Sequence, residues 1–462
     1  MRLVALGGLG WRTISLIACE TSVIFGAVYA AAYVRLSEQA FQQQHYLLPK
    51  AALIAFVAQL CLYFADLYDL RVINDRRELF VRAVQACGAA SLILAGVYFW
   101  LPDLIVGRGV FLIATVPVII LVFSWRLAFD WATRHVAPRE RLLLVGTNEG
   151  AVRLARELYE RRDHDVEIVG FIDPDPSRVG APIINPGVIG TVEDIPAIVR
   201  ARNVDQVVVS LAEARGQLPM DKLLEMKLDG VTFTHLASVY EKYTGKIAIE
   251  NLRPSWLIFS DGFQKSNVQR WAKRTIDIVV ASVGLVVALP LMALIALCVK
   301  VTSPGPVLYH QPRVGLRGRI FTLHKFRSMR RDAERTTGAV WAKKNDERVT
   351  EIGRLLRRAR LDELPQLWNV LRGDMSIVGP RPERPEFVSD LTRDIPFYGQ
   401  RHVVRPGVTG WAQVQYTYGA SVEDAMEKLQ YDLFYIKNRS IALDLFIIAK
   451  TAKTVLTARG AQ

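Results

Sequence analysis

IVVASVGLVVALPLMALIALCV, residues 278–299, is a run of 22 consecutive residues without a charged side chain. An α-helix rises about 1.5 Å per residue, so a helix of this length just spans the roughly 30 Å hydrocarbon core of a bilayer. Pro290 stands near the middle of the run, where proline removes a backbone hydrogen bond and clashes with the preceding turn. The segment is long enough to cross a membrane, yet it contains a residue that bends helices.

The residues on either side of this segment bear on whether it crosses the membrane or returns to the side on which it began. Basic residues stand on both sides, with Arg270, Lys273 and Arg274 before it and Lys300, Arg313, Arg317 and Arg319 after it. Because lysine and arginine accumulate on the cytoplasmic side of membrane proteins, a crossing would place one basic cluster on the outer side. We therefore predict a re-entrant helix over residues 275–300 that bends at Pro290 and returns to its own face. An ordinary fifth span with a tolerated proline is the alternative.

Earlier apolar runs predict a membrane-spanning helical bundle within residues 1–130. They cover residues 14–34, 48–68, 80–101 and 104–125, and each is long enough or nearly long enough to cross a bilayer. The lysines and arginines near their ends predict a cytoplasmic N-terminus and a cytoplasmic location for everything after the fourth span. Glu20 lies inside the first run. It is either a functional acid or an acid paired within the bundle or near its end, and the second reading is favoured.

Composition agrees with a membrane protein that handles anions. The chain has 462 residues, of which 51% are hydrophobic, and a formal net charge of +13. This combination suits a soluble part that lies against anionic membrane lipid or acts on anionic substrates. No nucleic-acid-binding signature accompanies the charge, so we expect no nucleic acid partner. The cysteines lie in apolar stretches without CxxC spacing and read as small buried hydrophobes, namely Cys19, Cys61, Cys87 and Cys298.

A second, cytosolic domain is predicted over residues 139–250. RLLLVGTNEGAVRLAREL, from Arg141, reads as strand, glycine turn and helix. Further strands are expected at VEIVGFID (166–173) and DQVVVSL (205–211), with a helix between them. Alternating elements of this kind predict a Rossmann-like parallel α/β domain. Its turn lacks GxGxxG, so a structural, regulatory or dimerising role and a bound nucleotide both stay open.

The remaining sequence, residues 268–462, concentrates charged motifs. KFRSM (325–329) follows a strand-like piece and offers Lys325 and Arg327 as phosphate contacts. LDELPQLWNVLRG (361–373) places Asp362 and Glu363 near a helix N-terminus, where backbone amides favour anions. Arg357 and Arg358, shortly before, are placed to help hold a phosphate.

These acids suit phosphoryl-type transfer. Carboxylates beside phosphates are where Mg²⁺ usually binds, and one carboxylate can attack phosphorus to form an acyl phosphate. GPRPE (379–383) then holds Arg381 between Pro380 and Pro382, whose fixed φ angles order the backbone in advance. Each motif alone could be a surface helix end or a surface turn. Their combination behind the re-entrant segment favours an active site.

The motifs together resemble the monotopic phosphoglycosyl transferases, the bacterial sugar transferase family. The resemblance rests on KFRSM (325–329), LDELPQLWNVLRGDMSIVGPRP (361–382), RPGVTGWAQV (405–414) and KLQYDLFYIKNRS (428–440). The preceding spans and α/β domain are similar to the long subgroup that starts exopolysaccharide, capsule or O-antigen repeat units. The resemblance implies a mixed α/β catalytic domain with a re-entrant membrane helix. At the break of that helix this chain has Leu289-Pro290 where the family often has Ser-Pro, which puts the helix angle in doubt.

The resemblance also implies a reaction and roles. The family transfers a sugar-1-phosphate from a UDP-sugar to undecaprenyl phosphate and releases UMP. Asp362 would be the nucleophile and the Mg²⁺ ligand, and Glu363 its acidic partner or the base for the incoming lipid phosphate. The other implied site residues would contact phosphate or nucleotide, namely Lys325, Arg327, Arg357, Pro380, Arg381 and Pro382.

The implied setting is the cytoplasmic face of the bacterial inner membrane. UDP-sugar, undecaprenyl phosphate and anionic lipid are the expected partners, and a homodimer is expected by analogy. A non-catalytic membrane scaffold or nucleotide-sugar sensor on the same fold is the alternative function. The identity of the transferred sugar is left open by these motifs.

Overall fold

A computed structural model of the chain describes residues 11–36, 46–65, 67–68, 76–106, 110–136, 139–160, 166–210, 220–249, 262–263, 265–330, 333, 347–416 and 421–456. The chain divides into two compact units, one within Gly8–Thr234 and the other within His235–Gln462. The first unit contains the N-terminal helices and the parallel sheet, and the second contains the predicted catalytic motifs.

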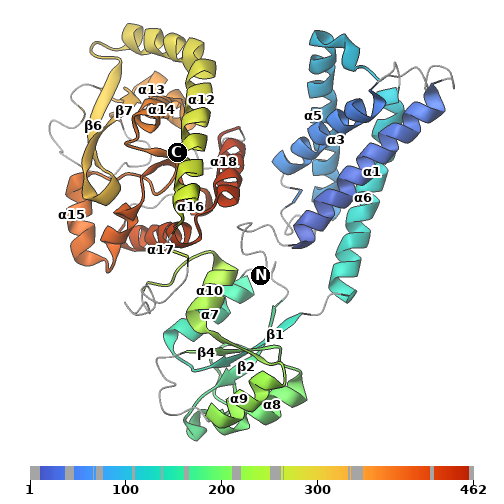
Figure 1. The fold of residues 1–462 in the computed structure, drawn as a ribbon, viewed down its shortest axis with the longest axis vertical. Coiled ribbons are helices and arrows are strands. Elements are labelled where there is room, and N and C mark those ends of the chain that lie inside the picture. The colour runs from blue at the N-terminus through green and yellow to red at the C-terminus, as the bar shows by residue number, and fades with distance from the viewer. Residues whose placement is uncertain are drawn as a thin grey trace. The chain divides into compact units, whose positions relative to one another are not determined.

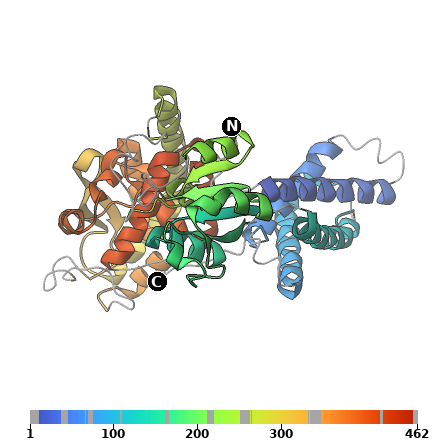
Figure 2. The same ribbon diagram turned by 90° about the horizontal axis from the view of Figure 1, so that it is seen from below.

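The N-terminal helices form a bundle (Figure 1, Figure 2). They are α1 (Trp11–Arg35), α3 (Leu47–Phe64), α5 (Arg76–Trp100) and α6 (Val110–Val136), with a short 3-10 turn η1 (Pro102–Leu104) before α6. In the part that the structure describes, α1, α3 and α5 are long and apolar enough to cross a membrane, as is α12 (Asn267–Thr302) of the second unit. Helix α6 contains a shorter apolar stretch, Ile113–Phe129, around Pro117. These helices confirm the prediction of a membrane protein with an N-terminal helical bundle.

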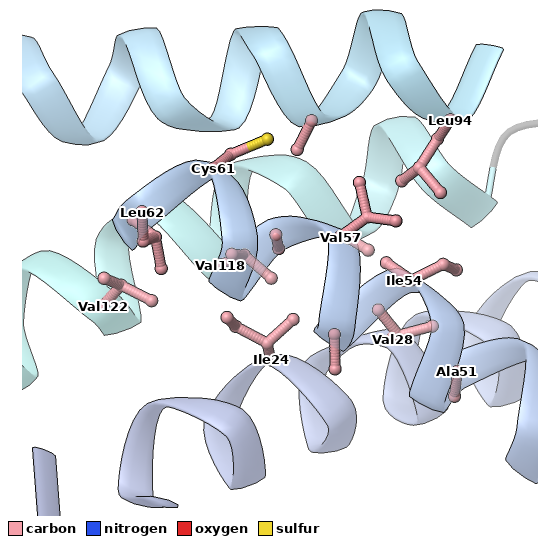
Figure 3. Close-up of a cluster of buried hydrophobic side chains, with 14 of the residues drawn as sticks. Ile24, Val28, Ala51, Ile54, Val57, Cys61, Leu62, Leu94, Val118 and Val122 are labelled. Atoms are coloured by element: carbon pink, nitrogen blue, oxygen red, sulfur yellow. The ribbon is translucent and has the colours of Figure 1, made fainter. Parts of the chain in front are cut away.

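Aliphatic side chains fill the centre of the bundle (Figure 3). Ile24 of α1, Ile54 of α3, Leu94 of α5 and Val118 of α6 are all nearly inaccessible to solvent and belong to one buried cluster. Cys61 is buried in the same cluster, and the cysteines of the chain are all free thiols. Cys61 is thus the small buried hydrophobe that the sequence predicted, whereas Cys19, Cys87 and Cys298 are only partly buried.

One charged pair interrupts this apolar interior. Glu20 of α1 and Arg126 of α6 are both fully buried, and Arg126 Nε lies 2.6 Å from Glu20 Oε1. Tyr68 donates its hydroxyl proton to Glu20 Oε2 at 2.6 Å, and Arg126 also donates to the carbonyl oxygen of Leu67. The structure therefore places Glu20 in an ion pair inside the bundle, which is the favoured one of its two readings.

Removing one partner of this pair should destabilise the bundle far more than removing an exposed acid. Glu20→Ala leaves Arg126 buried and uncompensated, so we expect the free energy of unfolding to fall by about 3–5 kcal/mol. Glu78→Ala, which opens the exposed pair with Arg82 on α5, should cost less than about 1 kcal/mol. Thermal unfolding of the purified protein in nanodiscs measures both. Equal shifts for the two variants would contradict this assignment.

The α/β domain is a five-stranded sheet in the order β3-β2-β1-β4-β5. Its elements are β1 (Glu140–Val145), α7 (Glu149–Glu160), β2 (Val166–Ile172), η2 (Pro176–Arg178), β3 (Val188–Gly190), η3 (Val192–Asp194), α8 (Ile195–Arg202), β4 (Gln206–Val209), α9 (Met220–Leu228) and β5 (Thr232–His235). Strand β1 pairs in parallel with β2 and β4, and β2 pairs in parallel with β3. Gly146 follows β1 with a φ of 109°, a value that favours glycine, and starts the turn into α7. This parallel sheet confirms the predicted α/β class.

The second unit surrounds a long bent helix and a hairpin. Its elements are α10 (Leu236–Thr244), α12 (Asn267–Thr302), β6 (Leu308–Val314), η4 (Leu316–Gly318), β7 (Ile320–Phe326), α13 (Glu351–Arg358), η5 (Leu361–Glu363), α14 (Gln366–Arg372), β8 (Ser376–Val378), α15 (Pro385–Asp394), η6 (Tyr398–Val403), β9 (Gly407–Thr409), α16 (Trp411–Gln415), α17 (Val422–Asn438) and α18 (Ile441–Leu456). Strands β6 and β7 are antiparallel, and β8 and β9 are parallel. Helix α17 crosses the core, where residues 429–436 are all buried.

Residues 236–249 contact the core of this second unit. Trp411 donates its indole proton to the carbonyl oxygen of Gly245 at 2.9 Å. Lys437 of α17 forms an ion pair with Glu241 at 2.6 Å, and Ile247 belongs to the buried cluster of the unit. Residues 236–249 therefore belong to the second unit, where they pack against α16 and α17.

Helix α12 contacts the same unit through both of its halves. Near its start, Asp277 accepts hydrogen bonds from Ser376 Oγ at 3.0 Å and from the Ile377 amide at 3.1 Å. Near its end, Ile295 and Val299 pack with Phe326 and Leu356 in a buried cluster. Pro290 lies inside the helix, and Figure 1 shows α12 changing direction before it leads into β6. The two arms of α12 therefore lie against one module.

Candidate active site

The two adjacent acids lie in a tight turn between helices. Asp362 and Glu363 belong to the 3-10 turn η5, which follows α13 and precedes α14. Arg360, the residue directly before η5, adopts a left-handed conformation with a φ of 53°. Leu361 and Leu364, on either side of the acids, pack against the cluster of Phe326 and Leu356. The flanking leucines hold the turn, and both acids are buried, at 7% and 9% exposure.

Glu363 is the meeting point of three chain segments. Its Oε1 accepts a hydrogen bond from Arg381 Nη2 at 2.8 Å and another from Lys325 Nζ at 3.2 Å. Burial opposes ionisation of this carboxyl, but the charges of Arg381 and Lys325 outweigh it and hold the pKa of Glu363 well below its usual range. Glu363 is therefore an ionised side chain that holds two cations in place.

Asp362 has the opposite environment. Among the residues that the structure describes, none donates a hydrogen bond or forms an ion pair with its carboxylate. Burial raises the pKa of Asp362, the negative charge of Glu363 adds to the rise, and Lys325 and Arg357 counteract part of it. Two neighbouring carboxyls with pKa values pushed apart are the pattern of groups with different chemical roles. Neither oxygen of Asp362 has a hydrogen bond or ion pair to a described residue, whereas one oxygen of Glu363 is bound by two cations, so Asp362 is the more open carboxylate toward a substrate or a cation.

The loop that carries Arg381 is held through its carbonyl oxygens. Proline has no N–H, so two of the residues in this loop cannot donate a backbone hydrogen bond. Instead, four consecutive carbonyl oxygens each accept from a different residue: Pro380 from the Gly407 amide at 2.9 Å, Arg381 from Arg401 Nη2 at 3.0 Å, Pro382 from Arg313 Nη1 at 2.9 Å and Glu383 from the Val314 amide at 3.0 Å. Gly379 just before them passes so close to the carbonyl of Arg405 that a Cβ would overlap it.

The predicted phosphate contacts divide into two groups. Lys325 and Arg381 meet at Glu363, and Arg357 lies close enough to Asp362 to influence its pKa while its Nε donates to Ser328 Oγ at 2.9 Å. Arg327 is directed elsewhere. It is 6% exposed, and its Nη2 donates to the carbonyl oxygen and the hydroxyl of Ser303, each at 2.7 Å. In this structure Arg327 binds the end of α12.

Sequence reasoning missed the buried residues that support the site. Arg313 and Arg401 bind the carbonyls of the Arg381 loop, and Asp432 accepts from Arg401 at 2.8 Å. Asn369 is fully buried and joins α14 to the hairpin, donating to the Thr322 carbonyl at 2.8 Å. A signal was present for Asp432, because an acid inside the apolar run LQYDLFYI is expected to have a buried partner.

The acids also fit one kind of metal site. In the described part of the chain, no three His, Cys, Asp or Glu side chains lie close enough to hold an ion by themselves. Mg²⁺ in phosphoryl-transfer sites usually takes one or two carboxylates and completes its shell with water and substrate phosphates. The open carboxylate of Asp362 meets that need, whereas Glu363 is occupied by two cations.

Comparison with known families agrees with this geometry. A family model described as "Bacterial sugar transferase" matches residues 268–458, which include α12 and both acids. A relative from Rhizobium leguminosarum, "Exopolysaccharide production protein PSS", is 42% identical over 190 residues, which are 40% of this chain and 95% of that protein. The chain belongs to the bacterial sugar transferase family. A second model, described as "CoA-binding domain", matches residues 63–224 of this family member.

Two further relatives of this sugar transferase have named substrates. The "UDP-N-acetylgalactosamine-undecaprenyl-phosphate N-acetylgalactosaminephosphotransferase" of Aeromonas hydrophila is 44% identical over 228 residues, which are 49% of this chain. The "UDP-glucose:undecaprenyl-phosphate glucose-1-phosphate transferase" of Xanthomonas campestris pv. campestris is 35% identical over 335 residues, which are 69% of this chain. The chain spans 53% and 66% of the lengths of these two relatives.

The adjacent acids should respond in opposite ways to the same substitution. The pKa of Glu363 is lowered in the folded protein, so its charge stabilises the fold above the unfolded value of about 4.3 and less as pH falls below it. Glu363→Gln should therefore lower the free energy of unfolding at pH 7 by roughly 1.5–3 kcal/mol.

For Asp362 the charge has the opposite effect on the free energy of unfolding. Its pKa is raised, so its charge costs stability as pH rises above about 3.9, and Asp362→Asn should raise the melting temperature at pH 7. The Asp362→Asn difference should shrink toward pH 4, whereas the Glu363→Gln difference should persist at pH 4, because the folded pKa of Glu363 lies well below that of the unfolded chain. Thermal unfolding across pH 4–8 measures them, and a loss of stability with Asp362→Asn would show that this pair is misassigned.

Proposed function

We propose that this protein transfers a sugar-1-phosphate from a UDP-sugar to undecaprenyl phosphate, releasing UMP, as the initiating step of exopolysaccharide, capsule or O-antigen repeat-unit assembly. The observation that carries the proposal is the asymmetric acid pair, in which Glu363 holds Arg381 and Lys325 while Asp362 is left open. The family match and the substrates named for the relatives support the choice of donor and acceptor.

The proposed reaction has two displacements at one phosphorus. In the first, an Asp362 oxygen attacks the β-phosphorus of the UDP-sugar, and the bond to the bridging oxygen breaks with its electron pair leaving on UMP. In the second, a phosphate oxygen of undecaprenyl phosphate attacks the same phosphorus, and the Asp362 carboxylate departs. A covalent intermediate lets a soluble donor and a lipid acceptor use the same site in turn.

The neighbouring side chains supply position and charge. Arg381 and Lys325 lie on either side of Glu363 Oε1 and face the transferred phosphate and its leaving group as fixed cations. Glu363 has a lowered pKa and holds a proton weakly, so the structure favours it as the anchor of these cations over the general base. Asp362 is the side chain that would hold Mg²⁺, which when bound neutralises phosphate charge.

The membrane setting is part of the proposal. We infer that α12 dips into one leaflet and returns, because residues from both of its halves bind the same module. The outer side of the helix between these contacts is apolar and exposed, including Val286, Val287 and Leu289 at 64–74% exposure. The basic flanks support a location of this module on the cytoplasmic face of the bacterial inner membrane, against anionic lipid. A homodimer stays a prediction from the family.

Transfer activity is tested with purified protein, undecaprenyl phosphate, Mg²⁺ and a panel of UDP-sugars. We expect UMP release with at least one donor, and a loss of about 10⁴-fold or more with Asp362→Asn because the nucleophile is removed. Asp390→Asn, an exposed acid on α15, is the control and should retain activity. Without acceptor, the unmodified protein should gain the mass of one sugar phosphate on the peptide containing residue 362.

Two results would count against this function. UMP release that survives Asp362→Asn would exclude the covalent route through this carboxylate. No UMP release with any donor from folded protein would favour the scaffold or sensor alternative.

The re-entrant topology predicts that both ends of α12 label from the same side. Val268→Cys and Val301→Cys each expose a thiol at an end of the helix, since the native side chains are 77% and 76% exposed. In a background without the native cysteines, a membrane-impermeant maleimide should reach both only from the cytoplasmic side, in inverted vesicles. Labelling of one end from each side would establish a crossing helix.

A further inference from the structure

Arg401 is a buried residue that contacts the backbone of the loop carrying Arg381. It belongs to η6, is 7% exposed, and donates to three different partners. Its Nη2 binds the carbonyl oxygen of Arg381 at 3.0 Å and Asp432 Oδ2 at 2.8 Å, and its Nη1 binds the hydroxyl of Tyr398 at 2.5 Å. A guanidinium can make these bonds together because its donors form a rigid planar fork.

The bond from Arg401 acts on the one residue of the loop whose backbone the prolines leave adjustable. The rings of Pro380 and Pro382 fix their own φ angles, and Pro382 restricts ψ of Arg381 to extended values, but neither ring fixes the φ angle of Arg381. That carbonyl is bound by Arg401, while the side chain of the same residue reaches Glu363 at 2.8 Å. A change in the φ angle of Arg381 would alter the position of its carbonyl relative to its side chain, and so the reach of its guanidinium to Glu363.

Asp432 compensates the charge of Arg401 inside the core. It lies on α17 at 1% exposure, next to Leu433 and Tyr431, which are also buried. Burial raises the pKa of Asp432 to about 6 even beside Arg401, which reflects the cost of desolvating a carboxylate. A buried ion pair of this kind is weak evidence for stability, because apolar residues of similar volume often stabilise a fold as well or better. What an apolar pair cannot supply is a hydrogen-bond donor to the Arg381 carbonyl.

We propose that Arg401 and Asp432 are positioning residues that set the backbone of Arg381, and through it the guanidinium that faces the donor diphosphate. The inference rests on the proposed sugar-phosphate transfer for its effect on activity. Asp432 acts through Arg401, and Arg401 acts through the Arg381 carbonyl. Neither side chain needs to touch the substrate.

The decisive variant replaces the whole pair with apolar residues. Arg401→Met with Asp432→Leu leaves no buried charge, so the melting temperature should stay near that of the unmodified protein, while Asp432→Asn alone should lower it. The matched control is the buried pair Lys246–Glu427, which joins the same helix α17 to the segment after α10. Lys246→Met with Glu427→Leu should leave both stability and UMP release close to normal.

If the pair positions Arg381, the apolar double variant folds but loses at least about tenfold in kcat/KM for the UDP-sugar. The KM for undecaprenyl phosphate should change less than twofold, because the proposed contact of Arg381 is with the diphosphate of the donor. Arg401→Lys keeps the positive charge but lacks the planar set of guanidinium donors. Its activity should therefore lie between those of the unmodified protein and the double variant. A double variant that folds and retains normal UMP release would overturn the inference.

Hydrogen–deuterium exchange gives a readout that does not depend on transfer. The amides of Gly379, Arg381 and Glu383 should exchange faster in the double variant than in the unmodified and control proteins. Unchanged exchange there would also overturn the inference. Failure of the proposed function would look different, as absence of UMP release from the unmodified protein with every donor, and the exchange rates would still decide whether the pair holds this loop.

Discussion

The contacts of a single carboxylate oxygen organise the candidate site. Glu363 Oε1 binds Lys325 at the end of the hairpin and Arg381 in the proline-flanked loop, so three segments separated by 18 to 38 residues meet at one atom. Because this oxygen is buried, each of its hydrogen bonds is stronger than it would be in water. The same arrangement leaves Asp362 without such partners in the described part of the chain. Among the described residues, one acid is therefore bound by two cations and the other is not.

Local sequence was a good guide where the relevant residues lie close together along the chain. The acid pair, the proline-flanked arginine and the strands at VEIVGFID and DQVVVSL are short patterns with their own turn or strand chemistry. Their positions agree with η5, the Arg381 loop, β2 and β4. Strand β3 has three residues, Val188–Gly190. So short a segment cannot show the alternation of apolar and polar side chains that predicts a strand.

Arg327 and Arg401 show what the sequence could not reveal. Arg327 stands one residue beyond the end of β7, where the unpaired carbonyls at the end of α12 draw its guanidinium away from the acids. Arg401 is separated from Asp432 by 31 residues and from Arg381 by 20, so its partners depend on how η6, α17 and the loop pack. No short-range sequence pattern distinguishes Arg401 from the other arginines as the one that binds Asp432 and the carbonyl of Arg381.

The anchoring of α12 has a consequence for how the protein can vary. Lys273, in the first half of the helix, lies between Asp277 of the same helix and Asp444 of α18, while the other end of the helix is bound through Arg327. On the proposed re-entrant topology, the height of the acids above the bilayer is set by these attachments within the second unit. The residues that set the depth of α12 in the membrane and the residues of the candidate site would then be inherited together, as parts of one unit. On this topology, sequence changes in the N-terminal helices or in the parallel sheet would not alter the height of the site relative to the lipid headgroups.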